Sequence, residues 1–185
     1  MEQQTLLLVD DDPSFLYGMR RALYQQPYRV FTAKSGQEAI SVLKELKVQV
    51  VVSDYKMPKM NGLCLLKRIK QSNPHIILIM LTGYADVGVL VEAINEVGLF
   101  KFLVKPVKIE LFKRSIISAM DLVKAREAGV ASHSESIRKM LLAELEQYYP
   151  GITSLPPRDK EGYYIIGVPQ QNLWVTLGVG RSPSA

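Results

Sequence analysis

Acidic, hydroxyl and amine side chains stand where apolar runs of the sequence end. Asp10 and Asp11 follow TLLLV, Asp54 follows VQVVVS, Thr82 follows IILIML, and Lys105 follows LFKFLV. Carboxylates that crowd together repel and raise one another's pKa, and a cation among them relieves that cost. Mg²⁺ prefers oxygen ligands and typically binds one or two carboxylates together with phosphate oxygens. With a lysine and a hydroxyl beside the metal, these residue types predict a site that accepts a phosphoryl group.

The five apolar runs alternate with amphipathic segments, which is the pattern of parallel strands covered by helices on both faces. The expected strands are 5–9, 28–33, 48–53, 76–81 and 99–104. Five such units in a row predict an α/β fold with an open, doubly wound, five-stranded parallel sheet, flavodoxin-like, in the order 2-1-3-4-5. The second strand then lies at the sheet edge, and the ends of the other four strands converge on one site.

Short-range signals mark where the helices begin and end. Asp12 followed by proline is typical of a helix N-cap, so we interpret Asp12 as a cap and not as a metal ligand. Ser35 and Glu38 form the S-x-x-E capping box ahead of the second helix. Asp86 can cap a helix that stops at a glycine. The last helix of the sheet domain is expected from about 109 to about 126.

The chain divides into a sheet domain, residues 1–127, and a C-terminal part of different character. Residues 128–135 are small and polar and indicate a linker. Residues 136–180 predict a helix followed by a β-hairpin, and 181–185 a disordered end. The helix carries an apolar stripe of Ile137, Leu141, Leu145 and Tyr148. One helix and one hairpin are marginal alone, so this extension should dock on the sheet domain or on a second copy.

Charge and composition limit the function further. Residues 1–127 contain 18 Lys and Arg against 13 Asp and Glu, whereas residues 128–185 contain five of each. A DNA-binding module concentrates positive charge, so the balanced C-terminal part predicts no DNA binding. The apolar runs are too short for a signal peptide or a membrane span. We expect a cytoplasmic protein away from membranes, with its single cysteine, Cys64, filling core space in a helix.

Four stretches, LLLVDDDP, VVSDYKMPKMNG, IMLTGYAD and KFLVKP, resemble in this order the receiver domain of bacterial two-component response regulators, the CheY-like family. The resemblance implies that Asp54 accepts a phosphoryl group from a sensor histidine kinase or a histidine phosphotransfer protein, in a reaction that needs Mg²⁺ or Mn²⁺. It implies a metal shell of four groups: Asp10, Asp11, Asp54 and the backbone carbonyl of Lys56. Thr82 and Lys105 are expected to contact the phosphoryl oxygens.

The same resemblance gives roles to residues that otherwise read as packing or surface. Phe102 stands where the family has a rotating aromatic, so Thr82 and Phe102 are expected to form a switch. A phenylalanine that only packs in the core is an equal alternative. Lys56 and Tyr84 stand two positions after the acceptor and after the hydroxyl residue, where bulky side chains limit the approach of water, and we hypothesise slow self-dephosphorylation. The proline after the site lysine resembles the family's cis-peptide turn.

The sequence is compatible with two other functions. A phosphohydrolase of the haloacid dehalogenase type also uses a strand-end D-x-D, with Asp10 as nucleophile and Asp12 as acid, but it leaves Asp54 without a role. An interaction module with the same fold and no phosphotransfer is the second alternative. The main prediction is a signalling protein that catalyses only its own phosphorylation and dephosphorylation.

The output of the protein is the least determined part. The stretch AINEVGLFKFLVKP is similar to receivers joined to cyclic-dinucleotide phosphodiesterase or hydrogenase-regulator modules. The residues that follow are too few for such a module and show no helix-turn-helix pair. We therefore predict that the C-terminal extension binds an unknown downstream protein or forms a homodimer.

Overall fold

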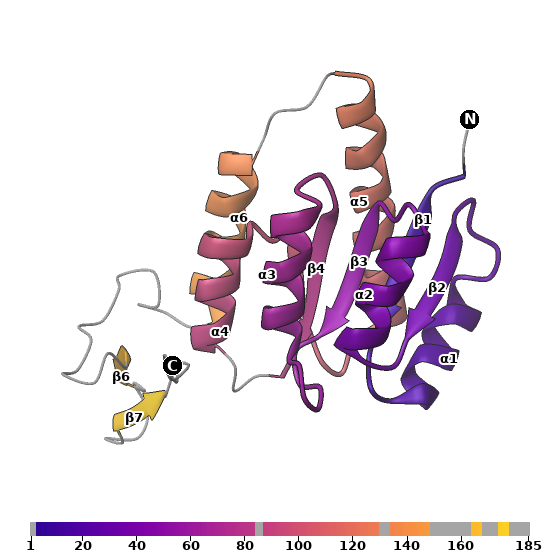
Figure 1. Ribbon diagram of the computed structural model, residues 1–185. Coiled ribbons are helices and arrows are strands. Elements are labelled where there is room, and N and C mark those ends of the chain that lie inside the picture. Colours follow the sequence, from indigo (N-terminus) through magenta and orange to yellow (C-terminus); the bar gives the residue numbers. More distant parts are fainter. Residues whose placement is uncertain (1–2, 84–86, 130–133, 149–163, 168–173, 178–185) are drawn as a thin grey trace.

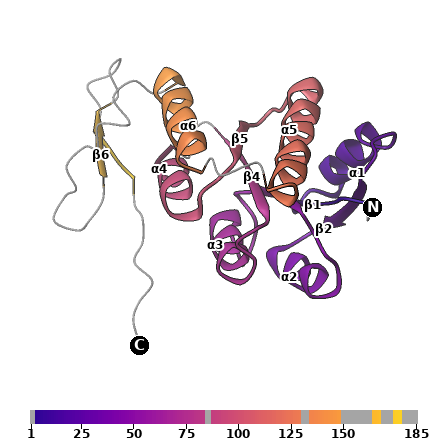
Figure 2. The ribbon, with the colours of Figure 1, turned by 90° about the horizontal axis from the view of Figure 1, so that it is seen from above.

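The computed structural model describes residues 3–83, 87–129, 134–148, 164–167 and 174–177 of the chain. Five parallel strands form one sheet in the order β2-β1-β3-β4-β5, as predicted, with helices on both faces (Figures 1 and 2). The strands are β1 (Thr5–Val9), β2 (Arg29–Ala33), β3 (Val50–Asp54), β4 (Ile77–Thr82) and β5 (Lys101–Val104). Asp54 and Thr82 are therefore the last residues of their strands, one position further inside the sheet than the sequence indicates.

A helix follows each strand of the sheet, and the first four helices connect successive strands. The helices are α1 (Pro13–Ala22), α2 (Gly36–Glu45), α3 (Gly62–Ser72), α4 (Val87–Glu92) and α5 (Ile109–Glu127). Helix α4 continues as a π-helical turn, η1 (Ala93–Val97), which the sequence did not predict. The predicted stop is confirmed, because Gly98 adopts a φ of 68°, a left-handed conformation that favours glycine. The predicted cap Asp86 lies outside the described residues.

Two predicted N-caps form at the carboxyl edge of the sheet. Asp12 Oδ1 accepts a hydrogen bond from the N–H of Ser14 at 2.8 Å. Ser35 Oγ accepts one from the N–H of Glu38 at 3.2 Å, and the Glu38 carboxylate accepts one from the N–H of Lys34 at 2.7 Å. The bonds from Ser14 and Glu38 satisfy N–H groups that a helix start leaves without intrahelical partners, so they fix where α1 and α2 leave the sheet.

The sheet separates two apolar layers. Leu6 and Leu8 of β1 pack with Phe112 in the layer under α1 and α5. Leu7 packs with Met80 in the layer under α2, α3 and the α4–η1 segment. Every residue of β1, β3 and β4 is buried, which is typical of central parallel strands. The strands that end at the acidic residues are thus a rigid support for them.

A sixth helix, α6 (Ser134–Tyr148), packs on the sheet domain beside α4 in both views (Figures 1 and 2). Its Leu141 and Leu145 are completely buried in the same apolar layer as Ile94 and Val97. The extension was expected to dock on the sheet domain or on a second copy, and its helix α6 docks on the sheet domain. The side chain of Tyr148, the last residue of the predicted stripe, lies outside the described residues.

The remainder of the extension contains two short strands. β6 (Tyr164–Gly167) and β7 (Trp174–Leu177) pair antiparallel, as expected for the hairpin. Residues 130–133, half of the predicted linker, and the whole predicted disordered end, residues 181–185, lie outside the described residues. Helix α6 begins at Ser134, so the last two residues of the predicted linker belong to the helix. No helix among the described residues is long and apolar enough to cross a membrane.

The prediction for Cys64 was wrong, because this residue is exposed on α3 and does not fill the core. The buried side of α3 is formed by Leu63, Leu65, Leu66 and Ile69. Cys64 lies in the first turn, where its N–H donates to Asn61 Oδ1 at 2.8 Å. Four larger apolar side chains on the same helix already fill the space against the sheet, so a small thiol is not needed there.

Candidate functional site

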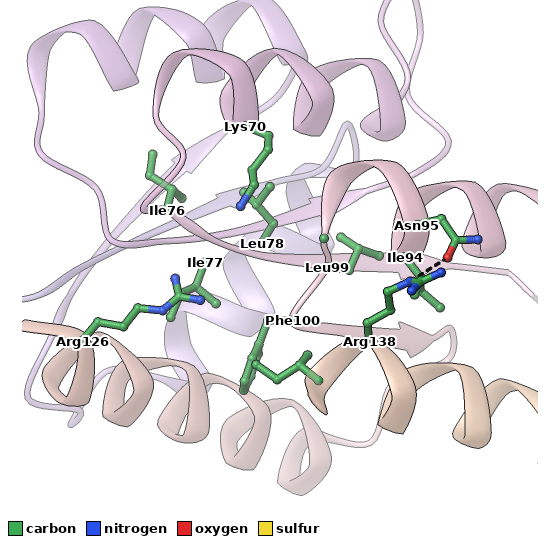
Figure 3. Close-up of a pocket in the computed structure, with 12 residues that line it drawn as sticks. Lys70, Ile76, Ile77, Leu78, Ile94, Asn95, Leu99, Phe100, Arg126 and Arg138 are labelled. Atoms are coloured by element: carbon green, nitrogen blue, oxygen red, sulfur yellow. Dashed lines mark hydrogen bonds between the residues drawn. The ribbon is translucent and has the colours of Figure 1, made fainter. Parts of the chain in front are cut away.

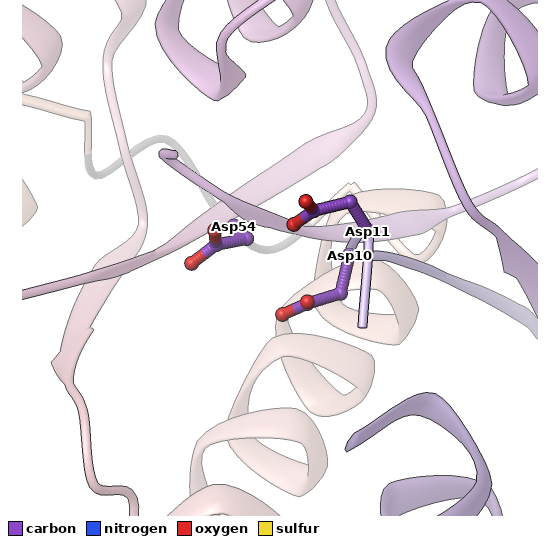
Figure 4. A group of neighbouring side chains, drawn as sticks. All are labelled: Asp10, Asp11 and Asp54. Carbon is purple, nitrogen blue, oxygen red and sulfur yellow. The ribbon is translucent and has the colours of Figure 1, made fainter. Parts of the chain in front are cut away.

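Three carboxylates meet at the carboxyl edge of the sheet. Asp10 and Asp11 follow β1 and Asp54 ends β3, and one oxygen of each carboxylate lies within 4.8 Å of the others. Figure 4 shows the carboxylates of Asp10 and Asp11 directed toward Asp54. Asp10 and Asp54 are buried, whereas Asp11 is exposed. The cluster therefore has a solvent-facing side and offers only oxygen donors, which suits a hard divalent cation.

Lys105 reaches the same cluster from the end of β5. Its Nζ donates to Asp10 Oδ2 at 2.7 Å and forms an ion pair with Asp54 Oδ1 at 2.8 Å. The ammonium group also lies 4.7 Å from the centre of the Phe15 ring on α1. The aromatic ring provides a cation–π contact and limits where the amine can lie. Lys105 is thereby placed beside the two buried carboxylates at once.

The protonation energetics show that one ammonium group does not balance three carboxylates. Burial raises the pKa of Asp54, the hydrogen bond and charge of Lys105 lower it, and the charges of Asp10 and Asp11 raise it again, so that the pKa lies above its ordinary value. For Lys105, burial lowers the pKa, but the hydrogen bonds and charges of Asp10 and Asp54 outweigh burial and raise it. A further cation would favour the ionised form of Asp54. The residues present therefore fit a divalent metal ion.

Thr82 and Lys105 lie at neighbouring strand ends. Thr82 is buried, and its hydroxyl donates to the Gly83 carbonyl at 3.3 Å. The N–H of Lys105 donates to the Thr82 carbonyl at 2.8 Å, and the bond from Lys105 to Pro106 is cis, as the resemblance implied. Asp54 pairs in register with the residue before Thr82. The structure therefore brings Asp10, Asp11, Asp54, Thr82 and Lys105 to one edge, as predicted.

The turn after Asp54 depends on a glycine that the sequence analysis missed. The N–H of Gly62 donates to the Tyr55 carbonyl at 2.8 Å, which closes the turn. A Cβ at Gly62 would lie 2.1 Å from the Asp54 carbonyl oxygen, a distance that no side chain tolerates. The dipeptide Asn-Gly is a turn signal and could have identified this position. Phe15 was also missed, and no local pattern indicates its contact with the site lysine.

Three further residues have less defined positions relative to the site. Lys56 is exposed, and the ligand role of its carbonyl stays a prediction. Phe102 is buried in the apolar layer that also contains Leu141 of α6. That position agrees with packing, and its rotation on phosphorylation stays a prediction. Tyr84 lies outside the described residues.

Comparison with known proteins agrees with this geometry. The family model of the response regulator receiver domain matches residues 6–117. The chain belongs to this family. It is 38% identical over 116 residues to "Transcriptional regulatory protein GlrR" of Escherichia coli K12, which is 63% of this chain and 26% of that protein. It is 33% identical over 141 residues to "DNA-binding transcriptional regulator NtrC" of Klebsiella pneumoniae, which is 74% of this chain and 30% of that protein.

A solved receiver domain has the same fold. The signal receiver domain of an HD domain-containing protein from Pseudomonas fluorescens Pf-5 matches with a TM-score of 0.65 and 29% identity, over 67% of this chain and 99% of that one. The predicted receiver domain and sheet order are therefore confirmed. The phosphohydrolase alternative has no support, since Asp12, its acid, is exposed and caps α1.

The match covers about a quarter to a third of the two curated regulators. Their names refer to transcription and, for NtrC, to DNA binding. The similarity does not extend over the whole of those proteins. Neither transcriptional regulation nor DNA binding is therefore shown for this chain. The expected absence of DNA binding for the C-terminal part is thus not confirmed, and it stays a prediction.

Proposed function

We propose that this protein is a response regulator whose receiver domain takes a phosphoryl group on Asp54 from a phosphohistidine of a sensor kinase or a phosphotransfer protein. The observation that carries the proposal is the convergence of three carboxylates and Lys105 at one sheet edge. In this arrangement Asp54 is the acid on a buried central strand, so it is the one held most rigidly for attack.

We infer that the metal is Mg²⁺, which Mn²⁺ could replace. Its expected ligands are four: Asp10, Asp11, Asp54 and the backbone carbonyl of Lys56. The excess of carboxylates over ammonium groups supports this assignment, as does the raised pKa of Asp54. When bound, the ion neutralises negative charge on the transferring phosphoryl group.

Phosphotransfer uses the remaining residues in defined roles. An oxygen of Asp54 forms a bond to phosphorus while the P–N bond of the phosphohistidine breaks, and the bonding electron pair returns to the imidazole nitrogen. The product is an acyl phosphate. Lys105 pairs with Asp54 at 2.8 Å and is placed to donate a hydrogen bond to one phosphoryl oxygen. The Thr82 hydroxyl is expected to turn away from the Gly83 carbonyl and donate to a second phosphoryl oxygen.

The lifetime and the output of the phosphorylated state follow from neighbouring residues. Lys56 and Tyr84 are proposed to limit the approach of water to the acyl phosphate. Movement of Thr82 would allow Phe102 to change position, and Phe102 shares an apolar layer with Leu141 of α6. Phosphorylation would then alter the surface on which α6 is docked. The C-terminal extension is accordingly proposed to bind a downstream protein or a second copy.

Intact mass spectrometry after incubation with acetyl phosphate and Mg²⁺ tests the phosphotransfer proposal. The wild type should gain one phosphoryl group, and Asp54→Asn should gain none. Asp121→Asn, which changes an exposed acid on α5, is the matched control and should behave like the wild type. Chelation of the metal should stop the reaction. A wild-type protein that gains no phosphoryl group would instead support the interaction module without phosphotransfer.

A further inference from the structure

A second site-like feature lies at the opposite edge of the sheet. A cavity of about 210 Å³ is formed where α6 meets the receiver domain (Figure 3). Ile77, the first residue of β4, and Phe100, which precedes β5, contribute to its apolar lining, together with Ile137 of α6. Because the strands are parallel, these strand starts lie at the edge away from Asp54. The cavity is therefore separate from the phosphorylation site.

Three cations from three different helices line this cavity: Lys70 of α3, Arg126 of α5 and Arg138 of α6. Neither aspartate nor glutamate is among its described lining residues. Lys70 Nζ donates to the Pro74 carbonyl at 3.1 Å, and an Arg126 nitrogen donates to the His75 carbonyl at 3.5 Å. Each of these two side chains keeps further N–H donors. Arg138 Nε donates to Asn95 Oδ1 at 3.0 Å, and Asn95 is the neutral polar residue of the described lining. The charged lining residues are consequently all cations.

Lys70 and Arg126 reach over Ile77 and Leu78 from opposite walls (Figure 3). Burial lowers the pKa of the Lys70 amine, and the positive charge of Arg126 lowers it further. Two like charges therefore face a partly buried space, and no carboxylate of the described chain pairs with either of them. An anion placed between them would remove the repulsion and accept their free N–H groups.

We propose that this cavity binds a small phosphate ester with an apolar body. The phosphate group lies between Lys70 and Arg126, whose ammonium and guanidinium donors suit phosphate oxygens. The apolar body lies on Phe100 and on Ile137 of α6, both of which are only partly buried. The cavity is smaller than the roughly 300–1,000 Å³ of pockets that bury drug-sized ligands, so the ligand is small. Because Ile137 belongs to α6, the ligand also strengthens the docking of α6.

This inference does not depend on phosphotransfer to Asp54. Titration of the full ¹⁵N-labelled chain with phenyl phosphate tests it, in EDTA and without Mg²⁺ so that Asp54 cannot react. Saturable shifts are expected at the amides of Ile77, Phe100 and Ile137. Inorganic phosphate lacks the apolar ring, and phenol lacks the phosphate group. Each should therefore bind at least roughly tenfold more weakly than phenyl phosphate. Shifts confined to the Asp54 edge, or no saturable shift at millimolar phenyl phosphate, would overturn the proposal.

Charge-removing variants identify the residues that bind the phosphate. Lys70→Met and Arg126→Gln should each weaken phenyl phosphate binding by roughly tenfold, since each loses a charged hydrogen bond. Lys44→Met, which changes an exposed lysine of α2 outside this cavity, should bind as tightly as the wild type. Far-UV circular dichroism verifies that each variant is folded. Equal affinity of wild type and Lys70→Met would contradict the assignment.

Discussion

Two leucines connect α6 to the receiver domain, and their removal has a calculable cost. Leu141 and Leu145 are 0% exposed and pack in the layer that contains Ile94 and Val97. A buried Leu→Ala substitution usually costs about 2–5 kcal/mol, because a cavity remains in addition to the lost transfer free energy. The double variant Leu141→Ala, Leu145→Ala should therefore lower the free energy of unfolding by about 4 kcal/mol or more, provided that α6 stays docked.

Undocking of α6 limits this loss. Once both side chains are shortened, α6 can leave the receiver domain, and the cost then equals the free energy of docking. A chain that ends after Glu127 lacks α6 and measures this free energy directly. If docking is weaker than the summed cost of the two cavities, the double variant and the shortened chain should agree within about 1 kcal/mol. Both should be less stable than the full chain.

Urea unfolding followed by far-UV circular dichroism measures these differences, and hydrogen exchange reports α6 separately. Met140→Ala is the matched control, because Met140 lies on the same helix and is 52% exposed. Its effect should be about 0.5 kcal/mol or less. A double variant as stable as Met140→Ala would show that α6 does not pack on the α4–η1 segment, and the reasoning would be refuted.

Further predictions concern the site and the core. Lys105→Met leaves the buried carboxylates without their ammonium partner and should lower the free energy of unfolding in metal-free buffer by about 2 kcal/mol, less than for a fully buried pair because Lys105 is 32% exposed. Mg²⁺ should then stabilise the variant more than the wild type in urea unfolding, and equal stabilisation would contradict the metal assignment. Lys56→Ala and Tyr84→Ala should shorten the lifetime of the acyl phosphate in decay assays, and unchanged lifetimes would remove their proposed role. Burial raises the pKa of Tyr28 to about 12, above the model-compound value of 10.0. The Tyr28 phenol ionises at higher pH in the folded protein than in the unfolded chain. Its contribution to the free energy of unfolding is therefore fully present below about pH 10 and is lost as the pH rises toward about 12. At pH 11 the wild type should have lost about 1.4 kcal/mol that Tyr28→Phe keeps. If the free energies of unfolding of the wild type and Tyr28→Phe changed in parallel between pH 9 and 12, the role assigned to Tyr28 would be contradicted. No hydrogen-bond partner for the Tyr28 hydroxyl is found among the described groups, so Tyr28→Phe should cost little at pH 7.

The order of the sheet and the convergence of the site residues follow from local patterns. Continuous apolar runs indicate buried parallel strands, and the carboxyl ends of such strands must share an edge. The residues after those runs could therefore be assigned to one site from the sequence alone. The caps at Asp12 and Ser35 were likewise readable, because a cap involves residues close in sequence.

Other features depend on which groups meet in space. The π-helical turn η1 and the exposure of Cys64 depend on how the helices fit against their neighbours. The contact of Phe15 with Lys105 joins residues of α1 and β5. The cavity proposed to bind a phosphate ester requires Lys70, Arg126 and Arg138, which belong to three different helices. No periodicity or spacing encodes such meetings.

The apolar stripe on α6 shows the division most clearly. Helical spacing alone established that Leu141 and Leu145 face one side and need a partner surface. It could not choose between the chain's own receiver domain and a second copy, because hydrophobic burial is non-directional and rewards either surface equally. Tertiary structure made that choice by placing the α4–η1 segment within reach of the helix. The same holds for the acids: their strand-end positions were set by the sequence pattern, but the closeness of Asp10, Asp11 and Asp54 required the sheet to form.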